Sequence, residues 1–203
     1  MALLILGLIL FFSVHLVSVM PSTRGTLVNK LGLGPYKGLY SLVAIAGFVM
    51  IVVGKGQAPF VSIWEPPLFL KHVTMLLMLP AIILLIAAYV PSNIKRKVRH
   101  PMLMATKLWA TAHLLINGDL ASMLLFLTFL AFGVVLMIGL KRRGPKAEHS
   151  SGGLKSESVK PENFKLESPS KPVYMDALVV VIGLVVYGAV AMHHQYLAGV
   201  PLF

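Results

Sequence analysis

Long apolar runs dominate the chain, and short polar segments separate them. Six such runs occur, at about 2–19, 39–54, 70–90, 102–117, 120–140 and 175–198. A helix needs roughly 20 apolar residues to cross a ~30 Å hydrocarbon core, so the shorter second and fourth runs need flanking residues to reach across. The runs are continuous rather than alternating, which excludes the strands of a transmembrane β-barrel. The pattern predicts an all-α fold: a polytopic transmembrane helix bundle of about six helices.

Basic residues gather in every second loop of this pattern. The loops after the first, third and fifth runs carry 15 of the 18 lysines and arginines. The opposite loops hold only Lys55 and Lys71, and Lys107 lies inside the fourth run. Because basic loops stay on the cytoplasmic side, both termini are predicted outside, an N-out/C-out topology. The Asn117-Gly118-Asp119 turn predicts a helical hairpin between the fourth and fifth runs.

Composition also divides the chain into segments. Residues 144–172 are rich in Ser, Lys, Glu, Gly and Pro, so they cannot bury enough apolar surface to fold and are predicted to form a disordered cytoplasmic linker. The predicted domains are a five-helix membrane domain at 1–143, this linker, and a sixth transmembrane helix within 173–203. The first run lacks a basic n-region and an A-x-A cleavage site, which favours a retained helix over a signal peptide.

The overall composition limits the possible partners. Hydrophobic residues make up 57% of the chain and charged residues only 12%, against about 25% in soluble domains, so the lipid bilayer is the predicted partner. The net charge of +11 does not predict nucleic-acid binding, because the basic residues flank membrane spans and form no patch interleaved with aromatics. The absence of cysteine excludes disulfides and thiolate metal sites, so His, Met or carboxylates must supply any metal ligand.

Histidines inside two predicted spans are the main candidates for a functional site. His15 lies in the first run, and His113 shares one helix face with Trp109 and Asn117 at i, i+4 spacing, with the small Ala110 leaving room beside it. With a rise of 1.5 Å per residue, the depths of the two histidines differ by only ~6 Å. They could therefore face each other and bind the iron of haem b, although each could equally form a hydrogen bond between packed helices.

Other charged residues in this region keep more than one interpretation. Arg99, at the predicted cytoplasmic entry of the fourth run, could snorkel to the interface or hold an anionic group of a cofactor. Asp119 and Lys107 could pair within the bundle or line a water-filled pocket, and Asp119 could equally be a loop residue.

Several stretches together resemble the NnrU family of bacterial membrane proteins. They are FFSVHLV around His15, GPYKGLYSLVA, the WEPP run at 64–67, LMLPAIILLIAAYVP and RHPMLMATKLWATAHLLINGDLAS, and they cover about residues 1–143. NnrU proteins are associated with denitrification. The resemblance therefore implies a role in nitrite or nitric oxide reduction at the bacterial inner (plasma) membrane, with the reductase machinery as partner.

The same family includes 15-cis-zeta-carotene isomerase, which looks like a haem b protein with two histidine ligands. These ligands resemble His15 and His113, so the resemblance implies haem b as cofactor and these two residues as metal ligands. The isomerase has a cysteine where this sequence has Ala110. Three alternatives stay open: a carotenoid isomerase on the same scaffold, a non-enzymatic assembly factor, and a methyltransferase using S-adenosylmethionine, which the Arg99-His100-Pro101 helix start suggests.

Overall fold

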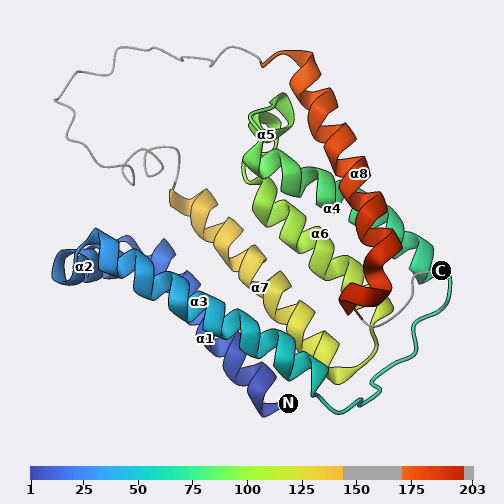
Figure 1. Cartoon of the computed structure of the whole chain (residues 1–203), viewed down its shortest axis with the longest axis horizontal. Helices are drawn as coiled ribbons and strands as arrows, with labels where there is room; N and C mark the ends of the chain where they lie inside the picture. The colour runs from blue at the N-terminus through green and yellow to red at the C-terminus, as the bar shows by residue number, and fades with distance from the viewer. Residues whose placement is uncertain (144–170, 199–203) are drawn as a thin grey trace. The chain divides into compact units, whose positions relative to one another are not determined.

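A computed structural model describes residues 1–143 and 171–198 (Figure 1). This part of the chain is helical and holds no strand, with one isolated bridge between Ser62 and Asp119. Most of the predicted linker at 144–172 lies outside the described residues. The helices are α1 (Ala2–Val19), α2 (Pro21–Leu31), α3 (Leu33–Gly56), α4 (Leu70–Tyr89), α5 (Asn93–Lys97), α6 (Pro101–Ile116), α7 (Leu120–Arg143) and α8 (Val173–Ala198).

Five of these helices, α1, α3, α4, α7 and α8, are long and apolar enough to cross a membrane, which confirms a multi-pass helical membrane protein. The fourth predicted span forms α6, but its 16 residues extend only ~24 Å, less than a typical hydrocarbon core. Pro101 begins this helix and the Asn117-Gly118 turn ends it, so neither end can lengthen. The N-out/C-out topology stays a prediction.

Two short helices lie where the sequence predicted loops. α2 follows Met20 with Pro21 in its first turn, a position where proline costs no hydrogen bond. α5 begins at a Ser92 cap, whose hydroxyl accepts from the backbone N–H of Lys95. The prediction of loops was wrong here because these segments are polar, and apolar periodicity carries no signal for such helices.

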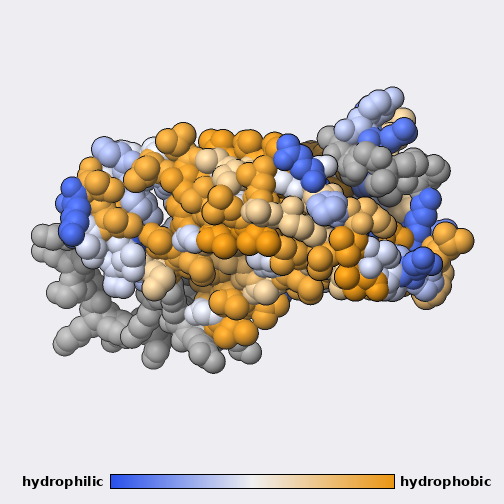
Figure 2. Space-filling model, turned by 90° about the horizontal axis from the view of Figure 1, so that it is seen from below, coloured by the Kyte–Doolittle hydropathy of each residue, from blue (hydrophilic) through white to orange (hydrophobic). Residues whose placement is uncertain are grey.

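The outer surfaces of the spanning helices are hydrophobic, as lipid requires. Hydrophobic residues cover most of the face seen in Figure 2. On α3, one-half or more of the surface of Leu42, Ile45, Phe48 and Val52 is exposed. Water would disfavour so much exposed apolar surface by about 25 cal/mol per Å², whereas lipid tails do not.

The chain divides into two units, and the first comprises residues 1–72 and 113–132. Within it α1 and α3 lie side by side (Figure 1) and meet at glycines on both helices, with Gly47 facing Phe11. A Cβ atom at Gly47 would lie 2.8 Å from the Phe11 backbone nitrogen. Small residues therefore allow the two backbones to approach closely, as is common between membrane helices.

The close contact at Gly47 predicts that a larger side chain there destabilises the protein. Gly47→Leu should destabilise the protein by about 2 kcal/mol, because its side chain must push α1 away from α3. Resistance to unfolding by sodium dodecyl sulfate, followed by helical circular dichroism, measures this. Gly38→Leu on the same helix is the control, since no atom lies within 4 Å of a Cβ there. Equal losses in the two variants would contradict the close packing of α1 and α3.

The second unit comprises residues 73–112 and 133–203. The Thr74 hydroxyl on α4 donates to the Ala112 carbonyl of α6 at 3.0 Å, and both residues are buried. Gly183 of α8 packs against Ile83 of α4, and Tyr187 donates to the Met75 carbonyl at 3.2 Å. These contacts join α4 to α6 and α8 through backbone carbonyls and small residues, again as expected for helices packed in lipid.

Candidate functional site

His15 lies on α1 with its ring held by the preceding turn. Its Nδ1 atom is 2.6 Å from the Phe11 carbonyl oxygen. A carbonyl can only accept a hydrogen bond, so Nδ1 carries the hydrogen, and Nε2 is the ring nitrogen left for a ligand role. Metal-bound histidines commonly make such a bond to a carbonyl, which fixes the tautomer and makes the other nitrogen more basic. The His15 ring is half-buried, and Nε2 is the nitrogen through which it would act as a ligand.

Aromatic rings surround the His15 imidazole. The Phe11 centroid is 4.1 Å away, that of Tyr40 on α3 is 5.6 Å away, and that of Phe132 on α7 is 6.3 Å away. Three helices, α1, α3 and α7, thus each place an aromatic ring beside the imidazole. These rings form an aromatic wall around it. Aromatic side chains of this kind commonly line the sites of planar, largely apolar ligands.

Tyr36 adds a polar group to this wall that the sequence analysis did not single out as a candidate. Its ring centroid is 6.4 Å from that of Tyr40, so the rings of Tyr36, Tyr40 and His15 follow one another. Tyr36 is 8% exposed, and its buried hydroxyl has no hydrogen-bond partner. A buried hydroxyl without a partner costs about 1–3 kcal/mol. This cost would be removed by a ligand with an acceptor oxygen.

His113, at the end of α6, has a different environment. It is half-buried, and its ring centroid is 4.7 Å from that of Phe126 on α7. The Asn117 amide donates to the His113 carbonyl at 2.8 Å, so it satisfies a carbonyl at the end of the helix. Trp109 is half-buried and Arg99 is exposed; both belong to the second unit. Whether Arg99, Trp109 and Asn117 bind a cofactor stays a prediction.

The two histidines contact α7 at different levels. His15 lies against Phe132 and His113 against Phe126, and six residues of helix correspond to ~9 Å of rise. Imidazoles that share one metal ion place their nitrogen atoms only about 4 Å apart. His15 and His113 therefore pack against different turns of α7. The pair as joint ligands of one iron stays a prediction.

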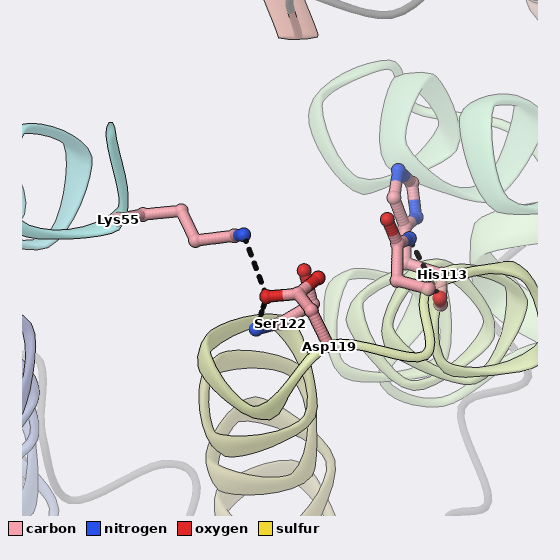
Figure 3. Close-up of polar contacts among 5 residues, drawn as sticks. Lys55, His113, Asp119 and Ser122 are labelled. Atoms are coloured by element: carbon pink, nitrogen blue, oxygen red, sulfur yellow. Dashed lines mark hydrogen bonds and ion pairs between the residues drawn. The ribbon is translucent and has the colours of Figure 1, made fainter. Parts of the chain in front are cut away.

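Asp119 forms an ion pair that links the end of α3 to the start of α7. Lys55, in the last turn of α3, reaches its carboxylate at 3.0 Å, and the Ser122 backbone N–H donates to the same oxygen, also at 3.0 Å (Figure 3). Burial raises the pKa of Asp119, but the hydrogen bonds from Ser122 and Lys55 outweigh this and hold it below the ordinary value of 3.8. Asp119 thus lies in the turn between α6 and α7, which confirms that it is a loop residue, and it pairs with Lys55 rather than with Lys107.

The turn around Gly118 holds the 57–69 loop against the start of α7. The Gly118 carbonyl accepts from the backbone N–H groups of Ile63 at 2.8 Å and Trp64 at 3.3 Å. The Leu120 N–H donates to the Val61 carbonyl at 2.9 Å. A Cβ atom at Gly118 would overlap the Trp64 carbonyl oxygen, so only glycine fits. The turn therefore packs against Trp64 and Pro66 of the WEPP run.

The described residues contain no group of three or more His, Asp or Glu side chains that could hold a metal ion on their own. A haem would need only one or two protein ligands, because its porphyrin supplies the other four. His15 and His113 are the candidates for such a ligand in this part of the chain.

Comparison with known proteins identifies the family. The model described as NnrU protein matches residues 3–202, nearly the whole chain. The chain belongs to the NnrU family. No curated protein and no solved structure matches it. The sequence resemblance was expected to end at about residue 143. The family model extends past that residue and covers α8 as well.

The sequence of this NnrU protein could have pointed to one of the missed residues. Lys55 and Asp119 are a base and an acid on the same predicted side of the membrane. Oppositely charged residues at span ends are candidates to pair. No pattern in the sequence could have marked Tyr36, because a partnerless hydroxyl is visible only once the helices are packed.

Proposed function

We propose that this NnrU protein binds haem b in the bacterial inner membrane and takes part in the reduction of nitrite or nitric oxide. The observation that supports haem binding is the His15 site: an imidazole with Nδ1 bonded to the Phe11 carbonyl, Nε2 available, and aromatic rings around it. The role in nitrogen-oxide reduction rests on the association of the NnrU family with denitrification.

In this proposal His15 would hold the iron, and the Tyr36 hydroxyl would donate to an acceptor oxygen of the bound group. A propionate would supply the acceptor that the buried hydroxyl lacks. Bound haem would supply an iron that gains and loses one electron at a time. Phe11 fixes the imidazole tautomer through its carbonyl, while Tyr40 and Phe132 shield the site from water. The proposed partner is a nitrite or nitric oxide reductase that exchanges electrons with this site.

The visible spectrum of the purified chain in detergent tests haem binding. We expect a Soret band that shifts on reduction, and we expect His15→Ala to lose it. His193→Ala is the matched control, because His193 makes the same bond to the carbonyl four residues earlier, at 2.9 Å, but is exposed. A colourless wild type, even with haem supplied, would overturn the proposal and favour the non-enzymatic assembly factor.

Two further variants test the other residues. His113→Ala should convert a six-coordinate low-spin spectrum into a five-coordinate high-spin one if His113 is the second ligand. If the packing against Phe126 is its whole role, the spectrum should stay unchanged. Tyr36→Phe should keep the band positions and speed haem loss to apomyoglobin roughly tenfold, which corresponds to about one hydrogen bond.

Growth of a bacterium that carries only the His15→Ala chain tests the physiological role. Nitrite or nitric oxide should accumulate during denitrifying growth, while the His193→Ala strain should behave like wild type. If carotenoid isomers accumulate instead, the chain acts as an isomerase, and the proposed role in nitrogen-oxide reduction fails although haem binding stands.

A further inference from the structure

A basic surface lies at one end of the second unit, where α4 ends and α6 and α8 begin. Its cations come from α5, the residues that follow it, and the approach to α8 (Figure 1). They are Lys95, Arg96, Lys97, Arg99 and Lys171, and all five are exposed. Tyr89 and Tyr174 are 71% and 68% exposed at the same helix ends, where aromatic residues typically mark the membrane interface. The surface is therefore expected at the depth of lipid headgroups.

Hydrogen bonds hold this surface in one shape. The Asn93 side chain accepts from the Lys171 backbone N–H at 2.9 Å and donates to the Lys171 carbonyl at 2.7 Å. Asn93 also donates to Asp176 at 2.8 Å, and the Ile94 N–H donates to the other Asp176 oxygen at 3.1 Å. These bonds join residues about 80 positions apart in sequence. Unlike an ordinary basic loop, α5 is fixed before any partner arrives, which lowers the entropic cost of binding.

Little negative charge faces Lys97 and Arg99 in the part of the chain that the structure describes. Asp176 is the carboxylate beside these cations among the described residues. Its two oxygens already accept from Asn93 and Ile94, and its charge also attracts Lys97. Lys95 donates to the Ala88 carbonyl at 2.7 Å, which satisfies the end of α4. Arg99 forms no ion pair or hydrogen bond with any residue that the structure describes. A counter-charge must therefore come from outside this part of the chain.

We propose that this surface binds the phosphate of an anionic phospholipid, with Lys97 and Arg99 as its main contacts. Clusters of Lys and Arg beside a transmembrane helix attract anionic lipids, and each cation contributes a factor of about five in binding. Lys supplies a point charge, and the planar guanidinium of Arg99 suits two phosphate oxygens. The site fastens the α5 end of the second unit to the membrane surface and is independent of haem binding.

Titration of the full chain in neutral detergent with phosphatidylglycerol tests this proposal. Binding is followed by native mass spectrometry and by the rise in melting temperature. Lys97→Gln combined with Arg99→Gln should weaken binding roughly 25-fold. Lys30→Gln combined with Lys37→Gln is the matched control, since both are exposed, carry the same charge and are predicted on the same membrane side. That control should keep nearly full binding.

Asp176→Asn separates a fixed site from simple charge attraction. It makes the chain more positive, so attraction by net charge alone predicts tighter binding. A fixed site predicts weaker binding, because a bond to Asn93 or Ile94 is lost. The proposal is overturned if the two double variants lose binding equally, if Asp176→Asn binds more tightly while still folded, or if phosphatidylcholine or inorganic phosphate gives the same stabilisation as phosphatidylglycerol.

Discussion

Gly118→Ala should destabilise the first unit by about 3 kcal/mol, a large effect for one methyl group. The added Cβ would overlap the Trp64 carbonyl oxygen, so the turn and the 57–69 loop must move apart. That movement breaks the bonds from Ile63 and Trp64 to the Gly118 carbonyl, each worth about 1 kcal/mol. Thermal unfolding in detergent, together with protease cleavage within the 57–69 loop, measures the loss.

Gly56→Ala is the control for this experiment, because it lies at the same end of the first unit and no atom lies within 4 Å of a Cβ there. Alanine is a better helix former than glycine, so this variant should match or slightly exceed wild-type stability. If both alanine variants unfold at the same temperature, the docking of the loop on the turn is not what stabilises this end of the protein.

Asp119→Ala should cost about 2–3 kcal/mol by removing two contacts at once. The Ser122 N–H loses its acceptor at the start of α7, and Lys55 loses its counter-charge. Asp119→Asn should cost less, because an amide oxygen can still accept from Ser122. A double-mutant cycle with Lys55→Met isolates the ion pair, and we expect a coupling of about 1 kcal/mol, since the Lys55 side chain is 35% exposed.

The pH dependence gives an independent check on Asp119. Its pKa is lower in the folded protein than the ordinary 3.8. The ion pair therefore contributes fully above that ordinary value, and its contribution is lost as the pH falls through the lowered pKa. The stability difference between wild type and Asp119→Asn should be constant near neutral pH and shrink in acid. A difference that persists after Asp119 is protonated would mean that the carboxylate charge is not involved.

Much of the fold could be predicted because lipid imposes a simple rule. Every backbone group in the membrane must bond within its own helix, so an apolar run of sufficient length has one available structure. This is why α1, α3, α4, α7 and α8 appear where the runs lie. The rule does not cover polar segments at the membrane surface. There Ser92 begins α5 by a local side-chain bond that hydropathy cannot show.

The candidate site was less predictable, because it depends on which helices meet. Helical spacing placed Asn117 on the face of His113, and only the structure shows that the Asn117 amide donates to the His113 carbonyl. Counting the rise per residue predicted that the depths of His15 and His113 differ by only ~6 Å, while the α7 residues that they contact lie ~9 Å apart along that helix. Rise per residue gives position along one helix, and it cannot give the offset between packed helices.

The sequence by itself determined that this chain is a multi-pass helical membrane protein, because long apolar runs leave the backbone no alternative in lipid. Its specific stretches also determined the NnrU family. Only the tertiary structure decided that Asp119 pairs with Lys55 and that Gly118 must be glycine. It also decided that Tyr36 lies near the rings around His15 and that its buried hydroxyl has no hydrogen-bond partner. Such facts depend on distances between side chains far apart in sequence. These distances are fixed by the packing of whole helices and not by any local pattern.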